Sequence, residues 1–416
     1  MADAFDVIVA GAGMAGASLA LELAHGGLSV GLIDPQPFEA MVAPTFDGRA
    51  SAIAYSSFRA WDVVGVGAAL APKAERIEQI MVTDGRGPGA AATRPSPVFL
   101  RFDAGEIADS SGGEPLGYML ENRHIRAALA TAVEAAPGIA VMAPARVERV
   151  AFQAGAARVA LADGRVLSAP LVVGAEGRGS VVRRDAGIGV MGWDYPQKGV
   201  VATVALERPH AGVAYEHFLP SGPFAILPLT GQRASLVWTE RNAAADALRA
   251  ASPEAFGSLL QRRFGDFVGR VSVEGPTFVY PLALQLAERL TAERCALVGD
   301  AAHGIHPIAG QGLNLGLKDA AALAEIVVDA IRRGEDPGAA AVLARYATWR
   351  RFDNAALAAA TDVFNRLFSN DHAAIRAVRG AGVALVNRIG PARRFFMREA
   401  GGAVGDLPRL LKGEAL

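Results

Sequence analysis

The sequence has almost no cysteine and no long hydrophobic run, and each lack excludes a class of protein. Cys295 is the only cysteine among 416 residues, which excludes a disulfide framework and a cysteine-rich zinc site and is typical of a reducing compartment. No apolar stretch approaches the ~18 residues that a membrane-spanning helix needs. The first residues, Met1 to Asp6, carry acidic side chains where a secretory signal would carry basic ones. We therefore expect a cytoplasmic protein, either free or peripheral on the inner face of the membrane.

An excess of charge of one sign is also lacking. The 41 lysines and arginines are balanced by 42 aspartates and glutamates, which gives a net charge of −1 and argues against a general nucleic-acid-binding protein. Hydrophobic residues make up 51% of the chain, so a disordered chain is excluded. A chain of 416 residues is long enough for two domains or slightly more.

Strand and helix patterns alternate at both ends of the chain and enclose a β-rich middle. Strands are predicted at 5–10, 29–34, 139–143, 146–152, 157–169, 171–174, through most of 199–240, at 271–282 and at 295–300. Helices are predicted after residue 13, near 51–60, at 122–136, at 243–264 and from about 312 onward. The pattern predicts an α/β fold with a discontinuous Rossmann-like nucleotide-binding domain, an inserted β-sheet domain and a C-terminal helical region.

The domain boundaries follow from the same pattern. The nucleotide-binding domain is placed at 1–75, 106–184 and 283–345. The β-rich substrate domain is placed at 76–105 and 185–282, and the helical region at 346–416.

A glycine motif after the first strand predicts a dinucleotide site. Gly11, Gly13 and Gly16 follow a strand and open a helix. In this pattern the first glycine permits the turn, the second lets the backbone approach a pyrophosphate, and the third lets the helix pack on the sheet. Asp34 ends the second strand, where a carboxylate can bind a ribose hydroxyl. The motif indicates a dinucleotide without separating FAD from NAD.

The segment 299–319 predicts a second grip on the same ligand. A buried strand delivers Gly299 and Asp300 to its carboxyl end, where ligands bind in α/β sheets. Pro307 to Gly312 form a rigid loop with few side chains, against which a flat ring could lie. Leu313 begins a helix whose first N–H groups can bind an anion or a partly negative carbonyl. An extended flavin dinucleotide suits two such grips, so we predict FAD.

Three other patterns are weak. GIGVMG at 187–192 matches the glycine motif, but no strand leads into it. Ser29 sits in a nucleophile-elbow pattern at the head of a strand and not on a strand-to-helix turn. His303 and His306 have no third metal ligand nearby. We therefore predict no metal site and no serine nucleophile.

The segment HPIAGQGLNLGLKD at 306–319 resembles the signature of the ubiquinone-biosynthesis monooxygenases. These are class A flavoprotein hydroxylases, related to para-hydroxybenzoate hydroxylase. The resemblance covers nearly the whole chain. It extends to Asp47-Gly48-Arg49, Asn122-Arg123, GPFAILPL at 222–229, Val237-Trp238-Thr239 and the segment 350–370. One departure is Glu176, where relatives usually carry Asp in a segment linked to FAD and NAD(P)H binding.

The resemblance implies the roles of several residues. Arg49 and Arg123 are expected to lie near the cofactor, and Pro307, Leu313 and Asn314 to surround the flavin ring. NAD(P)H would dock transiently and reduce non-covalently bound FAD, because the chain has no second nucleotide fingerprint. Dioxygen would then give a flavin hydroperoxide, which hydroxylates a polyprenylated phenol. Ubiquinone-synthesis proteins could be assembly partners.

No acid–base pair stands out in the sequence. His217 and Tyr215 lie in the β-rich middle and could assist deprotonation of a phenol. A lone histidine in a strand is more often structural.

Two other functions stay open. One is a flavin-dependent prenyl reductase or epoxidase on the same scaffold, and the other is a non-catalytic flavoprotein in a lipid-synthesis assembly. NAD(P)H oxidation would exclude the second, and product analysis would separate the first from a hydroxylase.

The tail at 376–416 has eight basic and three acidic residues, with apolar residues between them. One interpretation is that it packs on the nucleotide domain. The other is that it binds an anionic membrane surface, where a prenylated substrate would partition.

Overall fold

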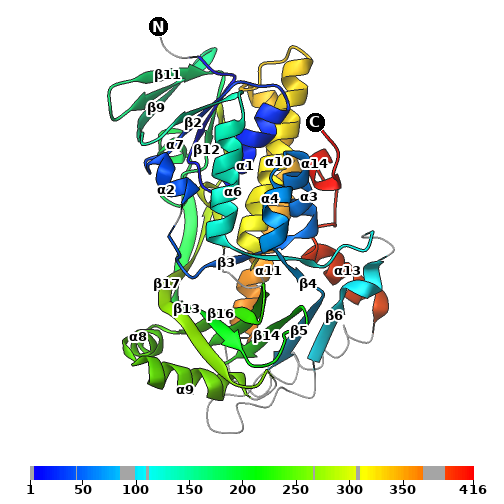
Figure 1. Cartoon of the computed structure of the whole chain (residues 1–416). Helices are drawn as coiled ribbons and strands as arrows, with labels where there is room; N and C mark the ends of the chain where they lie inside the picture. Colours follow the sequence, from blue (N-terminus) through cyan, green and yellow to red (C-terminus); the bar gives the residue numbers. More distant parts are fainter. Residues whose placement is uncertain are drawn as a thin grey trace.

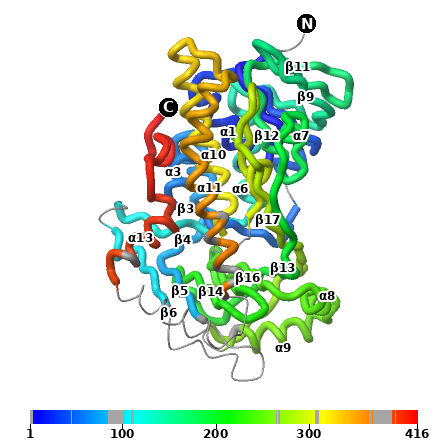
Figure 2. The backbone as a smooth tube through the Cα atoms, turned by 180° about the vertical axis from the view of Figure 1, so that it is seen from behind, coloured from blue at the N-terminus to red at the C-terminus, as the bar shows by residue number. Residues whose placement is uncertain are grey.

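The computed structural model describes residues 4–43, 45–84, 99–108, 112–265, 268–305, 310–368 and 389–416. It confirms the mixed α/β fold. Figure 1 shows an upper part that contains the first strands and α10, and a lower part dominated by a large sheet with α8 and α9. Two long strands, β13 (Val190–Leu206) and β17 (Val271–Ala287), run between the two parts, and the view from behind shows α11 (Ala340–Phe368) doing the same (Figure 2).

The upper part is built on a six-stranded sheet in the order β18-β19-β12-β1-β2-β8. These strands are β1 (Val7–Ala10), β2 (Val30–Ile33), β8 (Ile139–Met142), β12 (Leu171–Gly174), β18 (Thr291–Ala292) and β19 (Cys295–Leu297). All their pairings are parallel except that of β18 with β19. Every residue of β1, β2 and β12 is buried, as expected of a parallel sheet covered on both faces.

Alternate residues of β1 face two different layers. Val7 and Val9 belong to a core cluster with α1 (Met14–His25), α6 (Asn122–Ala135) and α10 (Gln311–Arg332). Ile8 belongs to a second cluster on the other face, with a small antiparallel sheet. That small sheet contains β9 (Val147–Gln153), β10 (Ala156–Leu161) and β11 (Val166–Ala169). The predicted strand at 157–169 is two strands, β10 and β11, paired as a hairpin that turns at Gly164 with φ +90°.

One element differs from its prediction. The expected helix near 51–60 begins only at Tyr55, because residues 50–54 form β3 (Ala50–Ala54) and α3 runs over Tyr55–Val63. Ile53 pairs with Tyr118 of β7 (Gly117–Glu121) in an antiparallel ladder, and β4 (Glu75–Ile77) completes this three-stranded sheet. An alanine-rich pattern suits strand or helix, so tertiary pairing decides the outcome.

The lower part is an eight-stranded sheet in the order β20-β17-β13-β16-β15-β14-β5-β6. The remaining strands are β5 (Gln79–Asp84), β6 (Phe99–Asp103), β14 (Val213–Leu219), β15 (Gly222–Leu229), β16 (Arg233–Arg241) and β20 (His303–Gly304). The predicted helical stretch at 243–264 is two helices, α8 (Asn242–Ala250) and α9 (Pro253–Phe264), and both cover one face of this sheet. Because β17 stays paired with β13 up to Ala287, the sheet extends beyond the predicted boundary at 282.

The remaining described elements are short or C-terminal. They are the helices α2 (Phe38–Val42), α4 (Gly67–Leu70), α7 (Val181–Asp185), α13 (Gly390–Ala400) and α14 (Arg409–Lys412), and the 3-10 helices η1 (Ala71–Lys73), η2 (Ala104–Ile107) and η3 (Gly299–Ala301). Within the described residues, no helix is both long and apolar enough to cross a bilayer. Leu410 and Leu411 are at most 1% exposed against α3 and α10. The packing interpretation therefore holds for this end of the tail.

A buried carboxylate joins α10 to its neighbours. Asp319 is 0% exposed and pairs with His303 of β20 through Oδ2. Its Oδ1 accepts a hydrogen bond of 2.8 Å from Nε of Arg350 on α11 and a longer one from Asn354. Burial acts to raise the pKa of Asp319, but His303 and Arg350 more than offset it and the pKa is lowered. The carboxylate of Asp319 on α10 thus links this helix to the loop at 299–305 and to α11.

Replacing that charge should destabilise the whole fold. We expect Asp319→Ala to lower the free energy of unfolding by roughly 3–5 kcal/mol, because it removes the fully buried carboxylate that pairs with both Arg350 and His303. The matched control is Asp353→Ala, which removes the partly exposed partner of the same Arg350 and should cost less than about 1 kcal/mol. Urea unfolding measures both. Equal losses in the two variants would contradict the special role of Asp319.

Candidate functional site

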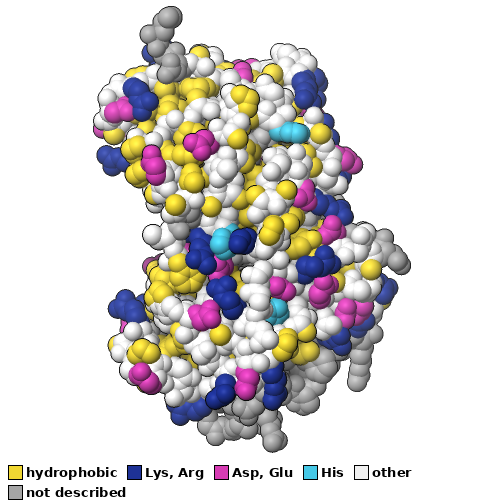
Figure 3. Space-filling model, viewed as in Figure 1, with side chains coloured by type: hydrophobic (Ala, Val, Ile, Leu, Met, Phe, Trp, Pro, Cys, Tyr) yellow, Lys and Arg dark blue, Asp and Glu magenta, His cyan; other side chains and the backbone are white. Residues whose placement is uncertain are grey.

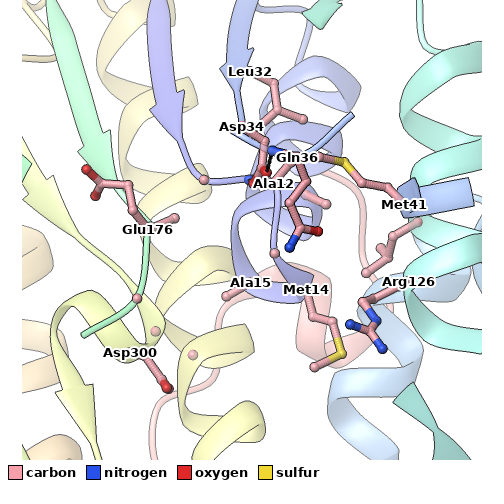
Figure 4. A pocket seen from close by; sticks show the side chains of 18 of the residues that line it. Ala12, Met14, Ala15, Leu32, Asp34, Gln36, Met41, Arg126, Glu176 and Asp300 are labelled. Atoms are coloured by element: carbon pink, nitrogen blue, oxygen red, sulfur yellow. Dashed lines mark hydrogen bonds between the residues drawn. The ribbon is translucent and has the colours of Figure 1, made fainter. Parts of the chain in front are cut away.

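A cavity of about 510 Å³ lies where α1, the end of β2, α6, the turn after β12 and the start of α10 meet. Figure 4 shows its lining side chains arriving from these separate elements. Most of the cofactor-site residues predicted from the sequence line it: Gly11, Gly13, Asp34, Gly299, Asp300, Gly312 and Leu313. The structure therefore brings together the two predicted grips, which are almost 300 residues apart in the chain.

The three glycines of the motif have different constraints. A Cβ on Gly11 would lie 2.4 Å from the carbonyl oxygen of Ala175, and φ is +99°. A Cβ on Gly16 would lie 1.9 Å from the carbonyl oxygen of Gly11, so only glycine fits at both positions. A Cβ on Gly13 would meet nothing within 4 Å. Gly13 lines the cavity. The space that a side chain would occupy there is therefore open to a ligand and is not filled by other protein atoms.

Two helix N-termini open into the cavity without a side-chain cap. Gly13 caps α1 and Gly310 caps α10; neither helix has a capping side chain or an acidic residue in its first turn. The first N–H groups of a helix carry a partial positive charge and need acceptors. Two such ends on one cavity suit a ligand with anionic or partly negative groups at two places.

The carboxylates of Asp34 and Asp300 line the cavity from different elements. Asp34 accepts hydrogen bonds from the N–H groups of Ala12 at 2.8 Å and Gln36 at 2.9 Å, so it is fixed beside the glycine turn (Figure 4). Asp300 is exposed and points into the cavity from the side of η3. Both retain lone pairs that can accept hydrogen bonds from sugar hydroxyls.

Two arginines line the cavity, Arg126 and Arg178, and Arg126 lies one turn beyond the predicted Arg123. Its Nη2 donates to Asp47 at 2.9 Å, while its Nε is buried and has no partner. A buried donor without a partner is costly and points to a missing ligand. Arg123 instead bonds Glu121 and lies over the ring of Phe46. The helical pattern at 122–136 identified the helix, but its phase relative to the sheet was needed to identify Arg126.

Arg49 also lies outside the cavity lining. Its Nε donates to Asp47 at 2.9 Å, and its guanidinium lies 5.4 Å from the ring centre of Tyr280 on β17. Burial acts to raise the pKa of Asp47, but Arg49 and Arg126 outweigh it and lower the pKa. Arg49 thus orients the carboxylate that in turn holds Arg126. Its direct contact with a cofactor remains a prediction, as does that of Arg123.

Glu176 lines the cavity but turns its carboxylate toward the start of α7 (Figure 4). It accepts hydrogen bonds from the hydroxyl of Ser180 at 2.5 Å and from the N–H groups of Val181 and Val182 at 3.1 Å. Burial nevertheless raises its pKa. The extra methylene relative to Asp is therefore used to cap α7.

The residues expected around the ring occupy different places. Leu313 lines the cavity. Asn314 is buried and joins α10 to β3, accepting from the N–H of Ala54 at 2.8 Å and donating to the carbonyl of Ala52 at 2.7 Å. Pro307 lies outside the described residues. His217 on β14 is remote from the cavity lining; it pairs with Thr83, and burial lowers its pKa to about 4.

The residues of the three weak sequence patterns have structural places in the fold where they are described. Residues 187–192 link α7 to β13 and form no strand–turn–helix unit, and Ser29 bonds Asp6 at the head of β2. His303 pairs with Asp319, and His306 lies outside the described residues. In the part of the chain that the structure describes, no three His, Cys, Asp or Glu side chains are grouped to hold a metal ion.

Comparisons with known proteins show the family to which the chain belongs. The family model described as "FAD binding domain" matches residues 4–360. The chain is 46% identical over 414 residues to "Ubiquinone hydroxylase UbiL" of Rhodospirillum rubrum. The aligned region covers 99% of this chain and 93% of that protein. It is 33% identical to "3-demethoxyubiquinol 3-hydroxylase" of Escherichia coli, over 95% of this chain and 98% of that one.

A solved structure supports the fold. The p-nitrophenol 4-monooxygenase PnpA of Pseudomonas putida superposes with a TM-score of 0.79 at 20% identity, covering 96% of this chain and 98% of that chain. At this identity the likeness concerns the fold alone.

A Cβ on Gly13 meets no protein atom, unlike one on Gly11 or Gly16. We therefore predict that a side chain at position 13 disturbs cofactor binding without disturbing the fold. We expect Gly13→Val to unfold like the cofactor-free wild type, because no protein atom is displaced, yet to weaken FAD binding at least tenfold. The matched control is Gly257→Val on α9, where a Cβ also meets nothing within 4 Å and flavin content should stay normal. Absorbance of bound flavin and thermal unfolding measure the two effects. Normal flavin occupancy in Gly13→Val would refute this placement of the pyrophosphate.

Proposed function

The chain belongs to the FAD-binding family of flavin-dependent monooxygenases, and from that membership we propose that it hydroxylates the aromatic ring of a polyprenylated phenol in ubiquinone biosynthesis. The enzyme uses FAD. NAD(P)H and dioxygen are its proposed co-substrates. The observation that carries the proposal is the match over nearly the full length of two ubiquinone hydroxylases, together with a cavity that has two uncapped helix ends.

The cavity residues fit FAD in one direction. The start of α1 would bind the pyrophosphate, and Asp34 the ribose of the adenosine half. Asp300 would bind hydroxyls of the sugar chain that leads to the ring. The start of α10, with Gly312 and Leu313, would lie at the ring, where its N–H groups favour negative charge on the reduced flavin. Arg126 would use its unpartnered Nε on the cofactor.

The cofactor supplies the oxygen-activating chemistry, and the protein supplies binding and shielding. FAD reduced by NAD(P)H would activate dioxygen for transfer to the ring. The half-buried start of α10 and the apolar residues of β3 would limit water at that place, which favours oxygen transfer over the loss of peroxide. This division of work explains why the sequence shows no conspicuous acid–base pair.

Oxygen transfer to a phenol tests the proposal. The purified flavoprotein is incubated with a short-chain prenylphenol, NADH or NADPH, and isotope-labelled dioxygen, and the product is analysed by mass spectrometry. We expect one labelled oxygen atom in the ring, and none with the flavin-poor Gly13→Val. Reduction or epoxidation of the prenyl chain would favour the alternative prenyl-lipid oxidoreductase. Absence of NAD(P)H oxidation would favour a non-catalytic flavoprotein.

A prenylated substrate also suggests contact with a membrane surface. Among the described residues of the tail, α14 is packed on the protein through Leu410 and Leu411, whereas α13 keeps an exposed face, so α13 is the candidate for this contact. The inner side of α13 packs through buried Met397, and Arg393 pairs with Glu106 at 2.6 Å. The outward face of α13 exposes Pro391, Arg394, Phe395 and Arg398, which line a shallow hollow with residues 403–405. The face of the molecule in Figure 3 otherwise shows basic and acidic side chains interspersed. A basic helix face with an exposed aromatic ring suits an anionic phospholipid surface.

Charge reversal on α13 tests this contact. We expect Arg394→Glu/Arg398→Glu to lose sedimentation with vesicles that contain anionic phospholipid, at about 1 kcal/mol per charge. The matched control, Arg149→Glu/Arg158→Glu, reverses two exposed charges on the small sheet and should bind like the wild type. Wild-type binding should also weaken between about 50 and 300 mM salt because screening increases. Wild-type protein that ignores such vesicles at low salt would contradict the contact.

A further inference from the structure

The pairing register of the eight-stranded sheet separates two neighbouring residues onto opposite faces. On β14, His217 pairs with Phe224 of β15, which packs with α8 and α9. Glu216 pairs with Ala225 of β15 and with Val82 of β5. Because side chains alternate along a strand, Glu216 points away from α8 and α9.

The face that carries Glu216 looks toward the nucleotide-binding part. The same row continues through Val237 and Val201 to Phe278, whose ring lies 6.1 Å from that of Phe46. A Cβ on Gly48 would lie 2.4 Å from the Phe278 ring, so the loop before β3 contacts this face.

A second contact joins this face to the start of α10. Val82 packs in one cluster with Ala52 of β3. A Cβ on Gly310 would lie 3.2 Å from Cβ of Ala52. Glu216 is therefore one strand from Val82, which shares a cluster with the Ala52 that lies beside Gly310. Val82 also packs near Leu367 of α11.

Glu216 has accessible surface but no partner. Its side chain is half-buried, as are Val82 and Val237 in the same row, whereas Phe224 and Trp238 on the opposite face are at most 3% exposed. No described group makes a hydrogen bond or ion pair with its carboxyl, and burial alone raises its pKa to about 8. Burial therefore favours the protonated carboxyl, which can both donate and accept a hydrogen bond.

A second polar group on this face also lacks a partner. Ser235 of β16 is 1% exposed, and its hydroxyl makes no hydrogen bond. It pairs with Leu227 and Thr203, which places it on the same face as Glu216. Polar groups without partners cost stability in a fold. Of these two, Glu216 keeps accessible surface and can reach a ligand, whereas Ser235 is covered by the protein.

We propose that Glu216 is the residue that binds the hydroxyl group of the phenol ring, from the sheet face that looks toward the start of α10. The assignment rests on the proposed function, because it takes the substrate to be a phenol. The neighbouring Ala225 and Val237 would contact the apolar part of the ring. Selection of a hydroxylated ring over an apolar one would then depend on Glu216, because its carboxyl stays without a partner when the ring carries no hydroxyl.

The assignment is tested by combining variants of Glu216 with ligands that have or lack the hydroxyl group. Binding of a short-chain prenylphenol and of the matching prenylbenzene, which lacks the hydroxyl, is followed by the absorbance of bound flavin in the holoprotein. The variants are E216L, which removes the hydrogen-bonding group, and E216Q, which keeps one. The control is D246N, which changes an exposed carboxylate of α8. E216A replaces E216L if the latter does not fold, as judged by flavin content and thermal unfolding.

We expect E216L to bind the prenylphenol roughly tenfold more weakly, with E216Q within about threefold of the wild type. Prenylbenzene should bind all variants alike. Equal losses for both ligands would show a structural role and overturn the assignment, as would unchanged prenylphenol binding in E216L. If the wild type bound neither ligand, the proposed function itself would fail, which is a distinct result.

Discussion

The buried charge of Asp319 is the interaction on which the site depends. It fixes α10 against β20 and α11 at once, through His303 and Arg350. The start of α10 and the preceding 3-10 helix form one wall of the cavity. Farther along α11, Asp362 accepts a hydrogen bond of 2.8 Å from Tyr195 on β13. One carboxylate therefore positions the cofactor wall and, through α11, helps to place the large sheet beside it.

The parts of the fold set by local sterics could be predicted from the sequence. Gly11 and Gly16 are required where backbone atoms approach closely, and such requirements are visible in a motif. The buried strands and amphipathic α6 follow from the spacing of apolar residues. Both predicted grips reach one cavity because the carboxyl ends of parallel strands share one edge of the sheet. The role of each predicted residue toward the cofactor remains a prediction.

The sequence could not predict which side of a helix or strand faces the site, because this depends on how the elements pack together. Arg123 and Arg126 lie on the same helix, and only the packing of α6 on the sheet decides that Arg126 lines the cavity. His217 and Glu216 are neighbours, and a shift of one residue in register exchanges their faces. Asn314 resembles a ring neighbour in its motif, yet its amide is used to hold β3. Chemistry can be read from residue types, but orientation requires the pairing partners.

The order of the central sheet has a consequence for synthesis of the chain. β1, which is made first, pairs with β12 at 171–174, and β12 pairs with β19 at 295–297. The glycine turn after β1 is therefore synthesised long before β19, which completes this part of the sheet. Such long-range pairings are slow to close because a long loop must be ordered first. Early segments must stay unaggregated until about three-quarters of the chain has emerged, so nascent-chain protection is a requirement of this topology.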